Sequence, residues 1–277
     1  MKLALDIYTQ RTTIGQEAAI RQAARVGFEY IHYDIAGIED ELDFIKSPSE
    51  YGKNIRRIMD ESGVKCSLAH APYFLRYGQK FDTSEVQYLE IVRAFEMAAE
   101  LGCGMMVVHS ISVPQDVDFK EYNLAFYRSL IPYAEKYGVK VAVENLYIAN
   151  DGKIVGGKLA NPDEMLDFMA ELPSEHFTVC LDLGHAFLTG TDPAEFIRAL
   201  GDKIGTIHLH DNCGLLDDHT IPGLGKIDWV AVRGALREIG YKGVLNYELS
   251  TYFGNFNDDD YESAAKLAFV AGGLLLC

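Results

Sequence analysis

Nine histidine, aspartate and glutamate residues of this 277-residue chain follow, or lie just beyond, short apolar runs. Imidazole and carboxylate groups suit Zn²⁺ and Mn²⁺, and carboxylates alone suit Mg²⁺. Because so many unpaired polar groups are costly away from water, we expect a divalent cation among them. They occur in the segments SLAHAPY, VVHS, VAVENL, CLDLGHA, IHLHDN, LDDHTIPGLG and NYELS, as His70, His109, Glu144, Asp182, His185, His208, Asp217, His219 and Glu248.

Short β-rich runs alternate with segments of helical periodicity from one end of the chain to the other. Runs such as MMVVHS and KVAVEN are apolar at consecutive positions, which is typical of parallel strands covered on both faces. The predicted strands are Lys2–Tyr8, Tyr30–Ile35, Lys65–His70, Met105–His109, Lys140–Glu144, Phe177–Asp182, Gly205–His210 and Val244–Glu248. The predicted helices are Gly15–Val26, Ser49–Ser62, Val86–Leu101, Phe119–Tyr137, Pro162–Glu171, Pro193–Leu200, Asp228–Ile239 and Tyr261–Leu274.

Eight such β–α units without a linker predict an α/β fold, a single (β/α)8 barrel domain that spans residues 1–277. A doubly wound open sheet is the alternative, but it would usually carry a glycine-rich phosphate loop after the first strand. The segment YTQRTT follows that strand instead, so the dinucleotide fingerprint is absent. In a barrel the carboxyl ends of the last six strands bring the nine polar residues to one rim, where barrel enzymes place their sites.

The composition limits the partners of the chain. Its formal net charge is −16, which disfavours phosphate backbones and anionic lipids except where a bound metal reverses the local charge. Five cysteines without a CxxC pair indicate reduced thiols and a cytoplasmic protein. The start MKLALDIYTQ is typical of a strand rather than a signal peptide, and LAFVAGGLLLC is too short to span a membrane.

Other histidines and aromatic residues have less specific interpretations. A lone histidine at a strand end is usually a hydrogen-bonded structural residue, and His32 and His176 receive that interpretation. Strand alternation places His210 on the same side as His208, in or around the site. Aromatic walls suit a sugar ring or chain. The predicted substrate-binding residues are Tyr8, Tyr73, His210 and Trp229.

The motifs HAPY, VENL, DLGHA, IHLHDN and DDHTIPGLGKIDW, in this order, resemble those of the xylose-isomerase-like TIM-barrel superfamily. In its isomerase and epimerase branch, the resemblance implies one metal ion held by a set of four residues. The two glutamates of that set would also form an acid/base pair on opposite faces of the substrate, and His185 would contact a substrate oxygen. The implied set is Glu144, Asp182, His208 and Glu248.

In the branch of endonuclease IV, an apurinic/apyrimidinic nuclease, the same resemblance implies three zinc ions. The second ion would occupy the set of four named above, and the others would use the remaining candidates. The acidic charge and the few cations of YFLRYGQKFD favour the sugar branch over DNA. The implied sets for the first and third ions are His70, His109 and Glu144, and His185, Asp217 and His219.

Two loops bear on the choice of substrate. Some ketose epimerases of the superfamily carry an arginine shortly after the histidine of the seventh strand, whereas this chain has DNCGLL there. A polyol, an inosose or a sugar acid is therefore open beside a ketohexose. The glycine-rich segment DGKIVGGK carries Lys153 and Lys158, which suit a phosphate or carboxylate, although such a loop is more often a solvated lid.

The leading prediction is a metal-dependent isomerase or epimerase that acts on a small sugar, sugar phosphate or polyol derivative through a metal-stabilised enediolate. Mn²⁺ or Zn²⁺ is the expected ion, with Mg²⁺ and Co²⁺ as alternatives. An endonuclease IV-like zinc phosphodiesterase and a non-catalytic sugar-binding barrel are the alternative functions. We expect a carbohydrate partner, no membrane and no nucleic acid, and the sequence leaves a homo-oligomer open.

Overall fold

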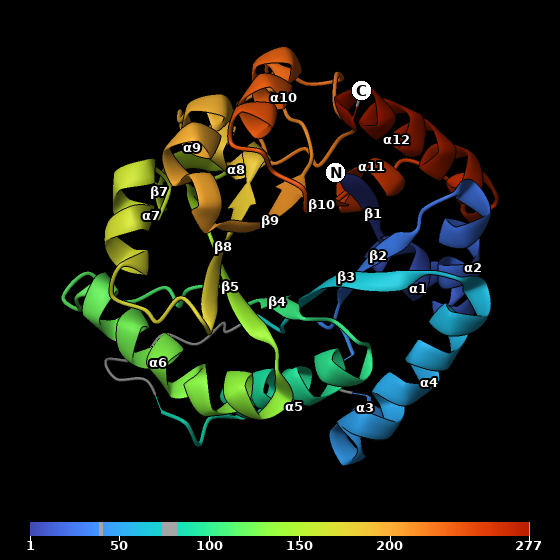
Figure 1. Ribbon diagram of the computed structural model, residues 1–277, viewed down its shortest axis with the longest axis horizontal. Coiled ribbons are helices and arrows are strands. Elements are labelled where there is room, and N and C mark those ends of the chain that lie inside the picture. Colours follow the sequence, from blue (N-terminus) through green and yellow to red (C-terminus); the bar gives the residue numbers. More distant parts are fainter. Residues whose placement is uncertain (39–40, 74–81, 277) are drawn as a thin grey trace.

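Eight parallel strands form a closed barrel in the order β1-β10-β9-β8-β5-β4-β3-β2 (Figure 1). The structure is a computed structural model and describes residues 1–38, 41–73 and 82–276. The barrel confirms the predicted fold class, and the predicted strand ends differ from the observed ones by at most two residues. The strands are β1 (Lys2–Asp6), β2 (Tyr30–Asp34), β3 (Lys65–His70), β4 (Met105–Val107), β5 (Lys140–Glu144), β8 (Phe177–Asp182), β9 (Ile204–Leu209) and β10 (Val244–Tyr247).

Helices surround the barrel and cover the outer face of its strands (Figure 1). The eight predicted helices are present, and several begin at a capping side chain; Asn161, for example, accepts the backbone N–H of Glu164. The helices are α1 (Tyr8–Ile14), α2 (Gln16–Val26), α3 (Leu42–Lys46), α4 (Pro48–Ser62), α5 (Val86–Glu100), α6 (Phe119–Tyr137), α7 (Pro162–Met169), α8 (Leu183–Leu188), α9 (Pro193–Leu200), α10 (Trp229–Glu238), α11 (Ser250–Phe253) and α12 (Tyr261–Leu276), with 3-10 turns at Gly201–Lys203 and Asp258–Asp260.

Four short helices, α1, α3, α8 and α11, were not predicted from the sequence, and α1, α8 and α11 begin within three residues of the ends of β1, β8 and β10. Polar side chains at the strand ends start two of them. Asp6 accepts the backbone N–H of Tyr8, and Asp182 accepts that of His185. The first contact explains why β1 ends at Asp6 and not at Tyr8 as predicted. These turns hold the strand-end side chains at the rim of the barrel.

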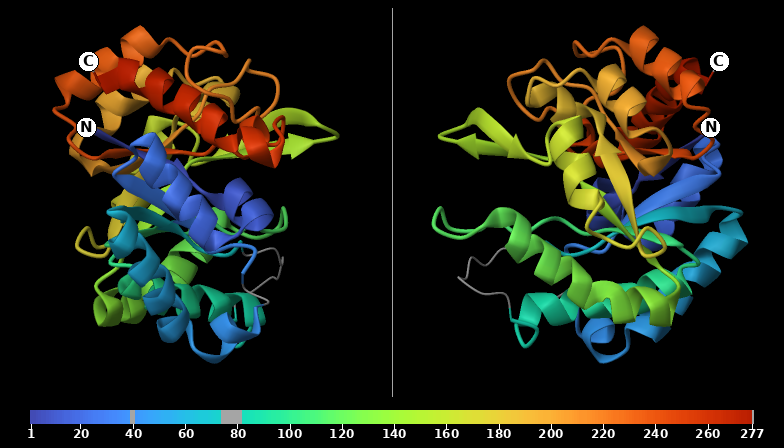
Figure 2. Two further views of the ribbon diagram at one scale, coloured as in Figure 1. Left: turned by 90° about the vertical axis from the view of Figure 1, so that its right-hand side faces the viewer. Right: turned by 60° about the vertical axis from the view of Figure 1, so that its left-hand side comes forward.

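The predicted loop after the fifth strand is an antiparallel hairpin of β6 (Leu146–Asn150) and β7 (Lys153–Lys158). Asp151 and Gly152 both have positive φ angles, which a two-residue hairpin turn requires. Figure 2 shows the hairpin extending beyond the ring of helices. Its projection explains why its sequence is glycine-rich and lacks the apolar run of a buried strand.

The interior of the barrel divides into an apolar floor and a polar mouth. Four buried side chains form the floor: Leu68, Val107, Ala142 and Cys180. Toward the carboxyl ends of the strands the buried side chains are polar and charged. The larger apolar core lies between the strands and the helices. Within the described ranges, no helix is both long and apolar enough to cross a bilayer.

Candidate metal centre

The centre of the site is the Nδ1 atom of His208 on β9, which faces three carboxylates from neighbouring strands. It lies 2.9 Å from Oε1 of Glu144 and 3.3 Å from Oε1 of Glu248. Oδ2 of Asp182 is 3.7 Å away. Glu144 and Asp182 end β5 and β8, and Glu248 follows β10. The barrel therefore brings these four side chains together, with one potential ligand atom of each within 4.8 Å of the others.

The two glutamates of this group have opposite electrostatic environments. Burial opposes ionisation of Glu144, but the charges of His208 and His109 outweigh it and hold the pKa of that carboxyl well below its usual range. Burial and the nearby charges of Glu144 and Asp182 raise the pKa of Glu248 well above its usual range. Without a cation, the ionised form is therefore favoured at Glu144 and disfavoured at Glu248, and a cation between them would favour the ionised form of both.

The donor set fits a divalent cation. One imidazole nitrogen and three carboxylates converge, and a single N–H on His208 Nδ1 can donate to only one of the facing oxygens. The remaining oxygens of Glu248 and Asp182 face the same point, where like charges repel. A cation would relieve this repulsion, and a mixture of nitrogen and oxygen ligands suits Zn²⁺ or Mn²⁺.

A second group shares Glu144 with the first. Nε2 of His109 lies 2.7 Å from Oε2 of Glu144, and Nε2 of His70 lies 3.8 Å from the same oxygen. The two histidine nitrogens are 3.1 Å apart. The burial that would lower the pKa of His70 is outweighed by Glu144 and Asp34, which raise this pKa to about 8. The predicted trio His70, His109 and Glu144 is thus assembled around one carboxylate.

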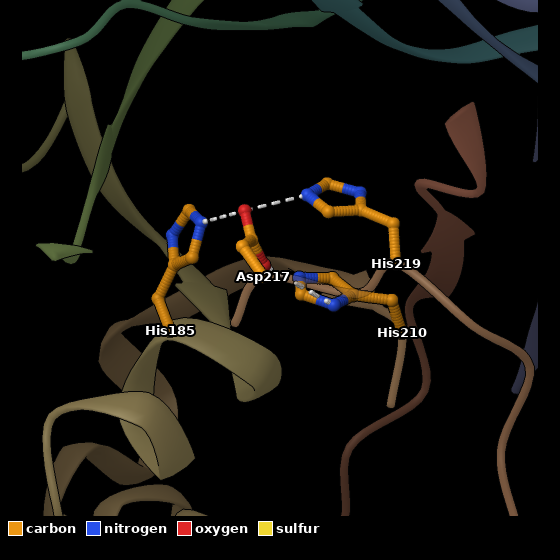
Figure 3. A group of neighbouring side chains, drawn as sticks. All are labelled: His185, His210, Asp217 and His219. Atoms are coloured by element: carbon orange, nitrogen blue, oxygen red, sulfur yellow. Dashed lines mark hydrogen bonds and ion pairs between the residues drawn. The ribbon is translucent and has the colours of Figure 1, made fainter. Parts of the chain in front are cut away.

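A third group surrounds Asp217 in the loop after β9 (Figure 3). Its Oδ2 lies 2.8 Å from Nε2 of His219 and 3.4 Å from Nε2 of His185. The ring of His210 stacks on that of His219, with centroids 4.1 Å apart. Burial would lower the pKa of His185, but Asp182 and Asp217 raise it to about 10. The four side chains have the types and spacing of a further cation site.

His210 connects this third group to the central one. Its Nε2 lies 3.1 Å from each carboxylate oxygen of Asp182, and its ring is fully buried. These contacts make His210 a partner of Asp182, and its predicted contact with a substrate stays a prediction. Gly184 leaves room for this ring, because a Cβ at that position would lie 2.0 Å from Cε1 of His210.

A cavity of about 180 Å³ opens beside Glu248 and His219. Its lining includes two of the predicted substrate-binding residues, Tyr8 and Tyr73, together with Asp6, Asp34 and Ser250. Trp229, the third predicted aromatic contact, lies outside this lining. Its indole N–H donates to Oδ2 of Asp211, a carboxylate that also accepts backbone N–H groups of the loop after β9.

Three residues of the first two strands join the site although the sequence interpretation left them out of it. Asp6 and Asp34 end β1 and β2 and line the cavity. Burial and the charge of Asp34 raise the pKa of Asp6 to about 7. His32 of β2 stacks on His208, with ring centroids 5.2 Å apart. The rule that barrel sites lie at strand ends points to the two aspartates as well.

The sequence also suggested roles for two further histidines, for Lys158 and for the segment YFLRYGQKFD, and the structure bears on them differently. His176 lies 3.2 Å from Glu135, in keeping with a structural role. His32 is fully buried, and the backbone of Tyr247 is near enough to act on its pKa, so its structural role stays a prediction. Lys158 lies 4.6 Å from the centre of the Phe119 ring, and its role toward an anion stays a prediction. Most of the segment YFLRYGQKFD lies outside the described residues.

The profile of a protein family described as "Xylose isomerase-like TIM barrel" matches residues 20–268. The chain belongs to this family. An uncharacterised protein of Methanocaldococcus jannaschii is 31% identical over 209 residues, which cover 71% of this chain and 69% of that protein. A D-psicose 3-epimerase of Enterocloster bolteae is 32% identical over 121 residues, which cover 44% of this chain and 37% of the epimerase.

Several solved structures share the fold over nearly the whole chain. A D-tagatose 3-epimerase-like protein has a TM-score of 0.75 at 24% identity, with 98% of this chain and 97% of the other covered. The IOLI protein, solved with a zinc atom, has a TM-score of 0.74 at 21% identity, with the same coverage of 98% and 97%. At these identities the likeness concerns the fold.

Proposed function

We propose that this protein is a divalent-metal-dependent epimerase or isomerase of a small sugar, sugar phosphate or polyol derivative. The observation that carries the proposal is the convergence of Glu144, Asp182 and Glu248 on Nδ1 of His208. The D-psicose 3-epimerase among the relatives supports the reaction class, and the IOLI structure, solved with a zinc atom, supports metal binding by a barrel of this fold.

The four converging side chains would hold the cation, with Mn²⁺ or Zn²⁺ expected and Mg²⁺ or Co²⁺ as alternatives. When bound, the cation would polarise a substrate carbonyl and stabilise the negative charge of an enediolate. Asp182 is kept in place by His210 and, through its backbone N–H, by the side chain of Asn145. Such supporting contacts orient metal ligands.

The two glutamates supply an acid and a base. Glu144, held ionised, would accept the proton of a substrate C–H bond, whose electron pair moves toward the carbonyl. Glu248, the other carboxyl of the pair, would deliver a proton to a carbon of the enediolate. Return to the opposite face of the same carbon inverts the centre, and return to the neighbouring carbon isomerises the sugar. Two carboxyls whose pKa values are driven apart are typical of such acid/base pairs.

The cavity beside Glu248 fits a small polar substrate. Its volume is about 180 Å³, and Tyr8, Tyr73 and Ser250 offer hydroxyl and aromatic surfaces in its lining. Aromatic walls with a few converging polar groups suit a sugar chain or ring. The substrate would therefore bind with its reacting carbon at Glu248 and its remainder between the tyrosines.

Proton exchange with solvent tests the proposal. Ketoses, ketose phosphates and inososes are incubated in deuterated water with the protein loaded with Mn²⁺, Zn²⁺, Mg²⁺ or Co²⁺, and followed by NMR. We expect one C–H signal to disappear from a substrate while its epimer or isomer accumulates. Glu248→Gln should abolish this exchange, whereas the surface variant Glu135→Gln should retain it. Absence of exchange on every compound would contradict the proposal.

A zinc phosphodiesterase of the endonuclease IV type is the second candidate. The observation that favours it is the assembly of two further ligand groups, around His109 and around Asp217, beside the central one. Under this candidate the purified protein would contain close to three zinc ions per chain and cleave a duplex with an abasic site. A sugar-induced shift in melting temperature without exchange or cleavage would instead indicate a non-catalytic binding barrel.

A further inference from the structure

The segment PGLGKIDW, to which the proposed function gives no role, folds around the side chain of Asp211. Asp211 lies two residues beyond the end of β9 and has no exposed surface. Five N–H groups point at its two carboxylate oxygens, and hydrogen bonds to an ionised acceptor are among the strong ones in proteins. The donors lie 2.7 to 3.2 Å away and are the backbone N–H groups of Asn212, Gly223, Gly225 and Ile227 and the indole N–H of Trp229.

The backbone of Asp211 holds the other end of the same loop. Its N–H donates to the carbonyl oxygen of Thr220 at 2.8 Å, and the N–H of Thr220 donates to the carbonyl oxygen of Asp211 at 3.1 Å. Thr220 directly follows His219 in the sequence. Asp211 therefore contacts the chain on both sides of the turn, at Thr220 and again between Gly223 and Trp229.

Gly225 shows how closely the loop approaches the carboxylate. A Cβ at this position would lie 2.2 Å from Oδ1 of Asp211 and 2.4 Å from the carbonyl oxygen of Asn212. Real Cβ atoms do not come so near to other atoms, so a side chain at this position would push the loop away. The glycine lets the backbone N–H groups reach the buried carboxylate.

His219 needs such support because its backbone conformation is unfavourable. Its φ angle is +43°, in the left-handed region that residues other than glycine adopt rarely. Such a conformation persists where the surrounding structure over-determines it. The ring has two fixed contacts: Nδ1–H donates to the backbone oxygen of Glu248 at 3.0 Å, and Nε2 lies 2.8 Å from Oδ2 of Asp217 (Figure 3). In this orientation His219 lines the cavity beside Glu248.

We infer that Asp211 is a positioning residue for His219: its carboxylate gathers the N–H groups of the loop after β9 and so fixes the backbone that carries the His219 ring into the wall of the cavity. The placement of His219 follows from these contacts, and its consequence for a substrate rests on the proposed function. A direct contact of Asp211 with a substrate does not fit, because N–H donors occupy both oxygens and the residue is fully buried.

NMR of the ¹⁵N-labelled, metal-stripped full chain tests the inference without a substrate. The wild type should show a slowly exchanging ring N–H that is missing from His219→Gln, namely the Nδ1–H that Glu248 accepts. Asp211→Asn has the same size, but its NH₂ group would face N–H donors in either orientation. The exchange of the His219 N–H with water should then become at least about tenfold faster, because the loop opens locally.

Two further variants grade this result. Trp229→Phe keeps an aromatic ring and removes one of the five donors, so it should accelerate the exchange by about threefold. Leu224→Ala is the matched control, because Leu224 belongs to the same loop and its side chain is 64% exposed. It should leave the exchange within about twofold of wild type.

A double-mutant cycle separates positioning from general stability. On a compound that shows proton exchange with the wild type, Asp211→Asn and His219→Gln should each lower kcat/KM at least about tenfold. The double variant should be within about threefold of the slower single variant, since both changes remove the same placement of the ring. A residue that acts only on the stability of the fold would give losses that multiply.

Every outcome of these experiments supports or overturns a stated point. The inference is overturned by a His219 N–H that exchanges equally slowly in Asp211→Asn and wild type, by the lack of a slowly exchanging His219 signal in the wild type, or by multiplied losses in the cycle. A wild type without turnover on any compound contradicts the proposed function alone, and the NMR comparison then decides the inference. Should Asp211→Asn not fold, Trp229→Phe takes its place, and unchanged exchange in that variant overturns the inference.

Discussion

Replacement of Asp6 by asparagine tests the electrostatics of the barrel mouth. Asp6 ends β1, is 8% exposed, and accepts the backbone N–H of Tyr8 through Oδ1 at 2.8 Å. Burial and the charge of Asp34 raise its pKa from 3.8 to about 7. The asparagine side chain would retain the size and the accepting oxygen of the aspartate and remove only its titration.

The expected magnitude follows from the pKa shift. The shift of about three units corresponds to about 4 kcal/mol at 1.36 kcal/mol per unit. Between about pH 4 and pH 7 folded Asp6 keeps a proton that the unfolded chain has lost, so the wild-type free energy of unfolding falls as the pH rises through this window. The loss is complete above about pH 7. Asp6→Asn should therefore be close to wild type at pH 4 and more stable by up to about 4 kcal/mol at pH 8.

Urea denaturation of both proteins at several pH values between 4 and 8, with EDTA to remove metal, measures this difference. Comparison of variant with wild type at each pH cancels the titration of the other buried groups. Asp258→Asn, at an exposed aspartate in the 3-10 turn Asp258–Asp260, is the surface control. A flat difference for Asp6→Asn across the same range would refute the account of the mouth as a region of crowded, buried carboxylates.

Three further predictions concern the metal site. Gly184→Ala would place a Cβ 2.0 Å from the His210 ring and displace that ring from Asp182. Calorimetry should then show Mn²⁺ binding weakened at least about tenfold. The control Gly104→Ala, which has open space at its Cβ, should leave Mn²⁺ binding unchanged. Glu248→Gln in the metal-free protein should raise the free energy of unfolding at alkaline pH, because burial and like charges disfavour the ionised carboxylate of the folded wild type. Urea denaturation of this variant, beside the surface control Glu135→Gln, measures the difference. Dialysis against EDTA should abolish proton exchange and lower the melting temperature, and both should return with Mn²⁺ or Zn²⁺; activity that survives complete metal removal would contradict the mechanism.

The repeating part of the fold could be predicted because its signals are local. Segments such as Lys140–Glu144 and Phe177–Asp182 are apolar at consecutive positions, and helices of three or more turns separate most of the strands. The hairpin of β6 and β7 was missed because its strands are exposed on both faces and carry little apolar pattern. Helix α8 was missed because it has only six residues and starts from a side-chain contact of Asp182.

The candidate site could be predicted to the extent that strand ends identify it. Glu144, Asp182 and His208 end or lie near the ends of their strands, and closure of the barrel brings them together. The stacking of His32 on His208 joins β2 to β9, a contact between distant segments that no local pattern contains. The hydrogen bond from Trp229 to Asp211 likewise depends on how the loop after β9 folds back, which the local sequence does not indicate.

Anomalous diffraction from crystals grown with Mn²⁺ or Zn²⁺ tests the central claim most directly, because it locates the ion without reference to substrate or activity. The account predicts a strong peak at about 2.0–2.2 Å from Nδ1 of His208 and from oxygens of Glu144, Asp182 and Glu248. A map with no peak among these four side chains, from crystals in which the ion is bound elsewhere or not at all, would contradict it.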